Sequence, residues 1–312
     1  MKSVNDSSVG NFVDFVKKHL ERGGLQAAFF PAGLVPGLYG ELAERARNGE
    51  IAPPLLEEGT LKGLVSGAFE VPPWAKSVIL VSMAQPIGRL RFEHAKGATW
   101  GIVPPQYREN QDDSVAEYLD KALGPAGFRT QKGKIPFKLA AAKSGLGEYG
   151  RNNLVYTSEN GSFHRLAAFF SDLPCGGFDW KEPVLMEACR SCEACLEGCP
   201  TGCIGRDRVL VRAERCLAFH NESTRPLPGW IDRAWLNSLV GCMRCQSVCP
   251  VDRPFLSRIE TVGTFSREET EGLLQASTPA GIPLSSAKRL ESLGLGEYLP
   301  ILGRNLQFLI SR

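Results

Sequence analysis

The cysteine spacing between residues 189 and 200 constrains this chain more than any other feature. Cys189, Cys192 and Cys195 recur every three residues, Cys199 follows four residues later, and Pro200 comes directly after it. Such spacing lets a short loop aim its first three sulfurs inward at one metal centre. The proline ends the loop because it fixes φ and lacks an N–H that would need a partner.

A second, shorter copy of this run lies about fifty residues further on. Cys242, Cys245 and Cys249 repeat its later half, again with a proline last. Leu239 stands where the first cysteine of a symmetrical copy would be. Cys216, between the two runs, is therefore the candidate for the missing ligand.

Together the two runs predict a pair of [4Fe–4S] clusters. In the bacterial ferredoxin run, the first three thiolates bind one cluster and the fourth reaches across to a second. By that rule, one cluster is held by Cys189, Cys192, Cys195 and Cys249. The other cluster is held by Cys199, Cys216, Cys242 and Cys245.

Zinc sites and disulfides are the alternatives to clusters. Zinc also binds Cys-x-x-Cys pairs, but eight thiolates with two Cys-Pro endings fit two cubanes better than two zinc sites. A disulfide framework suits small secreted chains, and no feature of this sequence indicates secretion. The two cysteines left over, Cys175 and Cys203, are interpreted as small, partly buried side chains rather than ligands.

The composition is that of an ordinary globular protein. The chain has 312 residues, 43% of them hydrophobic and 22% charged, which is enough apolar material for a core. A formal net charge of +2 gives no strong case for general nucleic-acid binding. No apolar run approaches the length of a membrane span, and the first residues lack an apolar signal core. With reduced cysteines and oxygen-sensitive clusters, we expect a cytoplasmic protein without membrane contact.

Hydrophobic periodicity predicts alternating helices and strands up to about Ser171. An amphipathic helix near the start ends at Gly23. Further helices are expected over residues 42–48, 114–123, 137–143, 267–274, 288–293 and 304–309, and strands over 77–81, 99–103, 154–156 and 163–170. This pattern predicts an α+β fold in three parts: a sheet domain over residues 1–171, a two-cluster ferredoxin-like module over 172–255, and a helical segment over 256–312.

A glycine-rich turn follows the helix predicted at 137–143. Gly145, Gly147 and Gly150 allow positive φ and a close approach of the backbone to a flat or anionic group. Because the turn comes after a helix rather than between a strand and a helix, the dinucleotide fingerprint does not apply. A simple helix-ending turn and a cofactor cradle both remain open.

Between residues 136 and 250 the order of motifs resembles the epoxyqueuosine reductase family, which is itself similar to the reductive dehalogenases. The motifs are Gly-Leu-Gly…Gly-Arg-Asn at 145–152, Gly-Ser-Phe at 161–163, Ser-Asp-Leu-Pro at 171–174, Cys-Leu-Ala-Phe at 216–219 and Gly-Cys at 241–242. Members of the family pair a nitroreductase-like, cobalamin-binding α/β sheet domain with a two-cluster ferredoxin module. The resemblance therefore implies cobalamin as a further cofactor and identifies the chain as a divergent member.

The same resemblance implies that the glycine turn lies against the corrin ring. The cofactor-binding residues would then be Ser144, Gly145, Leu146, Gly147, Tyr149, Gly150, Arg151, Asn152 and Asn153. Tyr149, Arg151 and Asn152 are the candidate side-chain contacts.

The chain departs from the family where the substrate chemistry would take place. Family members have an aspartate, the proton donor, just upstream of the helix that precedes the turn, but residues 130–136 contain no carboxylate. Tyr107 is the candidate acid in its place, since a phenol in a cofactor pocket can give up a proton, and Arg108 is the candidate to orient an anionic group. A tyrosine that merely packs after two prolines is the alternative.

These features predict an enzyme: a reductase that passes electrons from an external ferredoxin- or flavodoxin-type donor through two clusters to a cobalamin, for a reductive reaction on an unknown substrate. Two alternatives are a ferredoxin-type electron-transfer protein and a corrinoid-activating reductase with no small-molecule substrate of its own. A tRNA partner is possible because residues 129–151 are rich in lysine and arginine, but it is not indicated, since ordinary solvation of these charges is the preferred interpretation.

Overall fold

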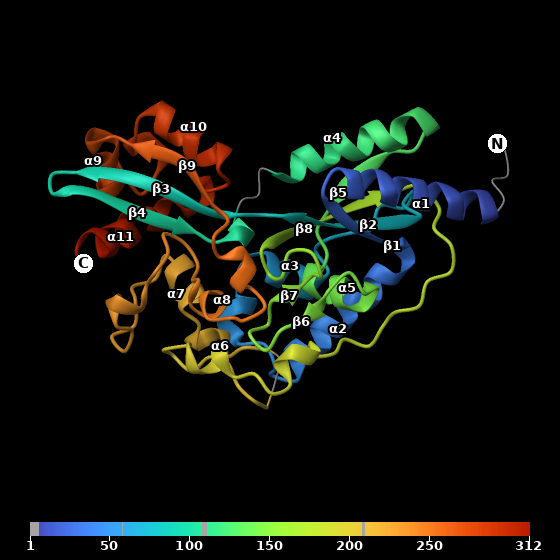
Figure 1. The fold of residues 1–312 in the computed structure, drawn as a ribbon, viewed down its shortest axis with the longest axis horizontal. Helices are drawn as coiled ribbons and strands as arrows, with labels where there is room; N and C mark the ends of the chain where they lie inside the picture. The colour runs from blue at the N-terminus through green and yellow to red at the C-terminus, as the bar shows by residue number, and fades with distance from the viewer. Residues whose placement is uncertain (1–5, 58, 108–110, 208–209) are drawn as a thin grey trace. The chain divides into compact units, whose positions relative to one another are not determined.

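The computed structural model describes residues 6–57, 59–107, 111–207 and 210–312 (Figure 1). Within them the chain forms two compact units. The first draws on the ranges Met1–Ala84, Gln111–Ser162 and Leu166–Arg190, and the second on Gln85–Asn110, Phe163–Arg165 and Ser191–Arg312. None of the described helices is long and apolar enough to pass through a membrane.

The first unit is built on a four-stranded sheet with helices on both faces (Figure 1). The strand order is β1 (Leu25–Pro31), β2 (Ser77–Ala84), β8 (His164–Ser171) and β5 (Thr130–Gly133), with β1–β2 and β5–β8 antiparallel. Helices α1 (Asp6–Arg22) and α4 (Gln111–Leu123) cover one face; α2 (Val35–Arg47) and α5 (Phe137–Ser144) cover the other. A short helix α3 (Gly59–Ser66) follows α2.

The sequence of β2 explains this three-layer arrangement. Ile79 and Val81 pack with α1 and α4, while Val78 and Leu80 pack with α2 and α5. Successive side chains of a strand point to opposite faces of the sheet. All four are fully buried because helices cover both faces. An uninterrupted apolar strand therefore requires cover on both sides.

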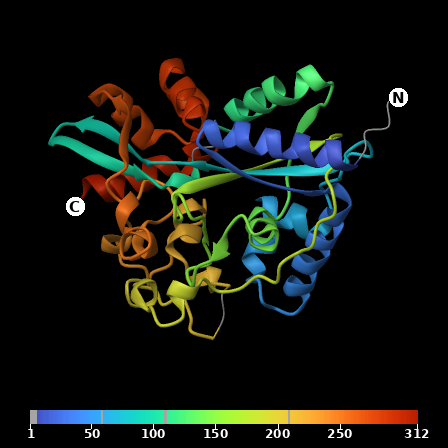
Figure 2. The same ribbon diagram turned by 45° about the vertical axis from the view of Figure 1, so that its right-hand side comes forward.

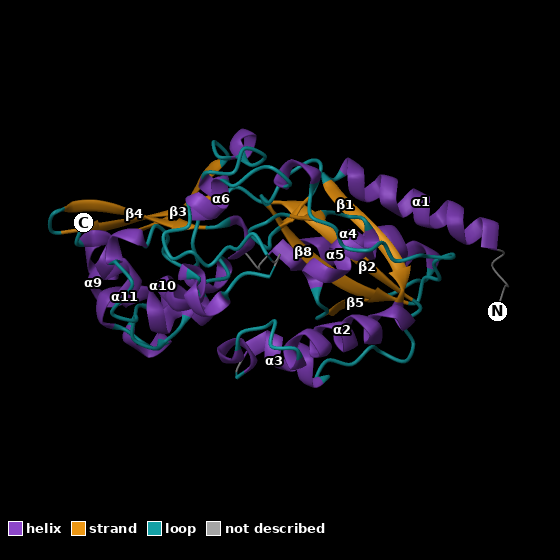
Figure 3. Cartoon of the chain, turned by 90° about the horizontal axis from the view of Figure 1, so that it is seen from below, coloured by secondary structure: helices purple, strands orange, loops and turns teal. Residues whose placement is uncertain are grey.

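The second unit contains a three-stranded sheet of β4 (Gly97–Val103), β3 (Ile87–His94) and β9 (Ile259–Phe265), in that order. Three helices near the end of the chain accompany this sheet: α9 (Arg267–Gln275), α10 (Leu284–Ser292) and α11 (Leu299–Ile310). They pack on one face of the sheet, where Leu90, Phe92 and Phe265 are buried (Figures 2 and 3). Leu299, Leu302 and Leu306 of α11 complete this core.

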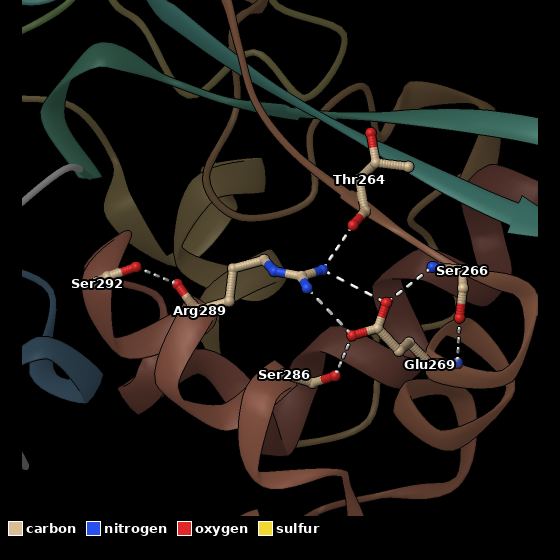
Figure 4. Close-up of polar contacts among 6 residues, drawn as sticks. All are labelled: Thr264, Ser266, Glu269, Ser286, Arg289 and Ser292. Atoms are coloured by element: carbon tan, nitrogen blue, oxygen red, sulfur yellow. Dashed lines mark hydrogen bonds and ion pairs between the residues drawn. The ribbon is translucent and has the colours of Figure 1, made fainter.

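Polar contacts fix the start of α9 to α10 (Figure 4). Ser266 and Glu269 form a capping box, in which each side chain accepts from the other residue's backbone N–H. Arg289 of α10 forms an ion pair with Glu269 and donates to the Thr264 carbonyl, and Ser286 donates to Glu269 at 2.7 Å. These bonds hold the end of β9, the start of α9 and α10 together.

The cysteine-rich part of the second unit is mostly loop. Its only α-helices among the described residues are α6 (Ala194–Glu197), α7 (Leu217–Glu222) and α8 (Arg244–Ser247). Short helices joined by loops are what closely spaced metal ligands require, since several thiols must turn toward one point.

The predicted α+β fold is confirmed, and each predicted helix and strand overlaps an element of the structure. Five strands among the described residues were not predicted: β1, β3, β5, β6 (Glu148–Tyr149) and β9. In β3, Arg89 and Arg91 alternate with Leu90 and Phe92, and only one face of that strand is buried. The tripartite division at residues 171 and 255 stays a prediction.

Candidate functional site

All ten cysteines lie within the described residues, and every one is a free thiol. The disulfide alternative thus has no support among the described residues. Cys189 ends a short 3-10 helix, Glu187–Cys189, in the first unit. The other seven predicted ligands belong to the second unit.

Five thiols of the second unit gather in one small apolar cluster. They are Cys195, Cys199, Cys203, Cys216 and Cys245, packed with Leu196, Ile204 and Val211. We call this set the five-thiol group. Three thiols predicted for one cluster are thus brought together: Cys199 just after α6, Cys216 at the N-cap of α7 and Cys245 within α8. Cys195 of the other cluster lies beside them.

Two repeats of the same local structure present these thiols. Helices α6 and α8 each begin two residues after a predicted ligand and carry the next one, Cys195 or Cys245. The ends of the two helices pack closely: a Cβ added at Gly198 would lie only 2.8 Å from a methyl carbon of Val248. Only glycine leaves room for this approach.

The thiols of the five-thiol group differ in acidity. Hydrogen bonds from Cys203 and from the Thr201 hydroxyl together lower the pKa of the Cys199 thiol to about 5, against the opposing effect of burial. Burial raises the pKa of Cys242 to about 12 and that of Cys245 well above its usual value. Thiolates bind metals and thiols do not, so we expect Cys242 and Cys245 to lose their protons only as iron binds.

Buried amides hold the ligand-bearing segments of the second unit together. Asn305 of α11 donates to the carbonyls of Asn221 and Leu239, at 2.8 and 2.9 Å. Asn221 donates to the carbonyls of Ser238 and Gly241, at 3.1 and 3.0 Å. This network ties α7, which begins after one predicted ligand, to the loop that leads into the next.

In the first unit, the glycine turn ends α5 and leads into a small hairpin. Gly145 adopts a left-handed conformation (φ 74°) at the helix end, as predicted for a helix-ending turn. The hairpin pairs β6 (Glu148–Tyr149) with β7 (Val155–Tyr156). A Cβ at Gly147 would lie 2.5 Å from Val155 Cγ1 and 2.7 Å from the Tyr156 carbonyl oxygen. The chain's own packing therefore requires this glycine.

The polar side chains of the turn bond within the first unit. Arg151 donates to the Cys189 carbonyl at 2.7 Å, so it anchors the backbone of the first predicted ligand. Asn152 donates to the Tyr156 hydroxyl at 2.9 Å. Lys138 donates to the Asn153 side chain at 2.7 Å and holds that residue at a positive φ of 62°.

We expect the Gly147→Ala substitution to destabilise the protein by about 1–3 kcal/mol, because its methyl group overlaps backbone that cannot rotate away. Gly176→Ala is the matched control, since no atom lies within 4 Å of the added carbon. Urea unfolding under anaerobic conditions measures both. Equal stability of the two variants would show that the turn tolerates a side chain.

Tyr107 lies within the 3-10 helix Pro105–Tyr107 of the second unit, and its hydroxyl donates to Glu222 at the end of α7. Burial and the Glu222 carboxylate raise the pKa of Tyr107 well above its usual value. Burial raises the pKa of Glu222 to about 7, although the Tyr107 hydrogen bond opposes the shift. Of this pair, Glu222 is the group that can release a proton near neutral pH. Arg108 lies outside the described residues.

Sequence reasoning missed three residues of interest. Glu222 gave no signal because its partner Tyr107 is 115 positions away. Cys203 was treated as a packing residue, and it is buried, but it also contacts Cys199. Residues 130–136 contain no carboxylate themselves, but Asp112 of α4 forms an ion pair at 2.7 Å with Lys132 of that stretch, and the Asp112 side chain is only 2% exposed.

The cysteine-rich segment matches a known family. Residues 188–252 match the model of the 4Fe-4S double cluster binding domain. All eight predicted ligands fall inside this range. The prediction of two [4Fe–4S] clusters is confirmed.

Relatives that match a longer stretch of this chain are named epoxyqueuosine reductases. The one from Vibrio cholerae is 30% identical over 227 residues, which cover 71% of this chain and 58% of the relative. The solved epoxyqueuosine reductase from Streptococcus thermophilus superposes with a TM-score of 0.65 at 19% identity, covering 96% of this chain and 81% of that one. The predicted resemblance to the epoxyqueuosine reductases is confirmed.

Another solved epoxyqueuosine reductase contains an epoxyqueuosine-modified stem loop of tRNA-Tyr. It has a TM-score of 0.56 at 21% identity and covers 96% of this chain and 84% of that one. At these identities the structures establish a shared fold. The chain spans between 48% and 65% of the first three curated epoxyqueuosine reductases it matches.

Proposed function

We propose that this protein is an iron–sulfur reductase that receives single electrons from an external donor and passes them through two [4Fe–4S] clusters to a bound cobalamin. The observation that carries the proposal is the five-thiol group, which lies within the segment matched by the double-cluster family. The relatives named as reductases support the same reading. We place the protein in the cytoplasm, where thiols stay reduced.

The eight predicted cysteines hold the clusters in this proposal. Cys199, Cys216, Cys242 and Cys245 bind one, and Cys189, Cys192, Cys195 and Cys249 bind the other. The residues fit this role because all eight are free thiols and four of them, Cys195, Cys199, Cys216 and Cys245, lie in the apolar five-thiol group. Burial and hydrogen bonds to sulfur then set the cluster potentials.

The turn at residues 144–153 is the proposed cobalamin site. A bound cobalamin would supply a cobalt centre that accepts electrons and delivers them to a substrate. The turn fits because its backbone is held on both sides: Lys181 N–H donates to the Lys143 carbonyl and Met186 N–H to the Tyr149 carbonyl, both at 2.8 Å. Thr157, just after the hairpin, has a buried hydroxyl with no hydrogen-bond partner among the described residues.

Within this turn the residues take different parts. Ser144, Gly145, Leu146, Gly147, Tyr149 and Gly150 form the surface offered to the cofactor. Arg151, Asn152 and Asn153 keep the turn in shape through bonds to the rest of the first unit.

A reductive step also needs a proton, and we assign it to the Tyr107–Glu222 pair. Glu222 holds the proton below about pH 7, and Tyr107 donates a hydrogen bond to one oxygen of its carboxyl group. This arrangement keeps Tyr107 in the reaction as a positioning residue, because its raised pKa makes it a weak acid.

The first substrate to test is epoxyqueuosine in a tRNA stem loop, because a solved relative contains one. Product formation is measured by mass spectrometry of the nucleosides after anaerobic turnover. Conversion would establish this substrate, whereas intact epoxyqueuosine beside a functioning electron relay would assign the protein to a different one.

The cofactor proposal is tested by titrating the anaerobically purified protein with cobalamin. We expect the absorbance of the corrin to shift to its base-off form and to saturate at equimolar cobalamin. No shift, with cluster absorbance intact, would leave the electron-transfer protein as the function. That second candidate is favoured by the absence of a carboxylate in residues 130–136.

A further inference from the structure

The thiol of Cys203 lies between two predicted ligands of one cluster. Its sulfur is 3.5 Å from that of Cys199, and its thiol also makes a hydrogen bond with Cys216. Cys203 is only 4% exposed, and the surrounding side chains are Ile204, Leu196 and Val211. Residues 188–252 thus offer nine thiols where two cubanes need eight.

We propose that Cys203 is an alternative ligand to Cys199 at one iron of the cluster that Cys199, Cys216, Cys242 and Cys245 bind. This inference rests on the cluster part of the proposed function and extends it to a residue outside the ferredoxin spacing. The independent observation that points to iron at this place is the double-cluster match over residues 188–252.

The geometry allows the exchange with little movement. Side chains occupy staggered rotamers about 120° apart, and such a change of χ1 moves a cysteine sulfur by about 3 Å. That displacement is close to the 3.5 Å that separate the two sulfurs. The backbone on either side stays fixed, since the Cys203 carbonyl accepts from Arg212 N–H at 2.8 Å and Cys199 begins the turn that Gly202 N–H closes.

The exchange is balanced and involves no change of oxidation state. The Cys203 sulfur forms a bond to iron as the Cys199 sulfur releases it. The proton of the Cys203 thiol passes to the Cys199 sulfur along the contact already present. No oxidant, reductant or further reactant is required.

The inference is tested by the iron and sulfide content of four variants purified without oxygen. We expect Cys199→Ala and Cys203→Ala each to retain the wild-type content of about eight irons per chain. The double variant C199A/C203A should fall to about four, or to about seven if the damaged cube keeps three of its irons. Cys245→Ala is the matched control, because it removes a ligand of the same cluster that Cys203 is not proposed to replace, and it should lose as much iron as the double variant.

Each outcome decides the inference. If Cys199→Ala loses as much iron as the double variant, Cys203 does not replace Cys199. Iron loss in the single variant Cys203→Ala would make Cys203 a primary ligand and would also overturn the inference. A wild-type protein with about eight irons upholds the proposed clusters in either case, so failure of the exchange and failure of the proposed function are distinguishable. The EPR signal of the reduced variants gives a second readout that does not depend on activity.

Discussion

Removing Cys216 is expected to cost the protein one of its clusters. Cys216 lies outside both cysteine runs, yet it joins the five-thiol group at the start of α7. A cubane that loses one of its four thiolates exposes an iron to water. The iron content of the protein should therefore fall from about eight irons per chain to about four, or to about seven if three irons of the damaged cube remain. Electron transfer through that cluster should stop.

The substitution is best made in a chain whose Cys203 is already alanine, because the Cys203 thiol contacts Cys216 and would blur the result. The parent Cys203→Ala gives the reference iron content. Cys175→Ala in the same parent is the control: Cys175 packs against the apolar core of the first unit and is not a predicted ligand. Full iron content after loss of Cys216 would refute the assignment of the eighth ligand.

Glu222 is expected to make the stability of the protein depend on pH. Its pKa in the folded chain is raised from 4.5 to about 7, chiefly by burial. A carboxyl group whose pKa is raised on folding contributes stability that is fully present below about pH 4.5 and is lost as pH rises through about 7. The loss amounts to about 3 kcal/mol, because each unit of pKa shift corresponds to about 1.36 kcal/mol of stability.

The Glu222→Gln variant should lack this dependence. The amide keeps an acceptor for the Tyr107 hydroxyl but carries no charge, so the variant should match the parent at about pH 4 and exceed its stability by about 3 kcal/mol at pH 8. Thermal unfolding across this range measures the difference. Glu214→Gln, which removes an exposed carboxylate of the same unit, should leave the parent's pH dependence in place.

The same pair should shape the pH dependence of turnover. If Glu222 supplies the proton, the rate falls above about pH 7 as this group ionises. In the Tyr107→Phe variant this alkaline limb of the pH–rate profile should move to higher pH, because the hydrogen bond that lowers the pKa of Glu222 is lost. A limb that stays in place would remove Tyr107 and Glu222 from the reaction, and unchanged cluster absorbance would show that the variant is correctly assembled.

Local patterns were sufficient for seven helices (α1, α2, α4, α5, α9, α10 and α11) and for the most apolar strands, whereas α3 and the short helices α6, α7 and α8 were not predicted. Helix α1 follows from a stripe that contains Val16 and Leu20, and α5 ends at Gly145 because a glycine can turn left-handed there. Strand β3 escaped prediction because its arginines give one polar face, and its apolar face is completed only by helices from the end of the chain. An apolar–polar alternation of this kind becomes a strand when a distant partner such as β9 pairs with it.

The sequence alone was enough to predict the clusters of this protein, because ligand spacing is a local property. A run of thiols three residues apart is typical of a loop that surrounds a metal centre. The tertiary structure decided what the remaining side chains do. It placed Cys203 against Cys199, joined Tyr107 to Glu222 across 115 positions, and turned Arg151 toward the Cys189 carbonyl. Such contacts depend on which distant segments pack together, so no spacing along the chain encodes them.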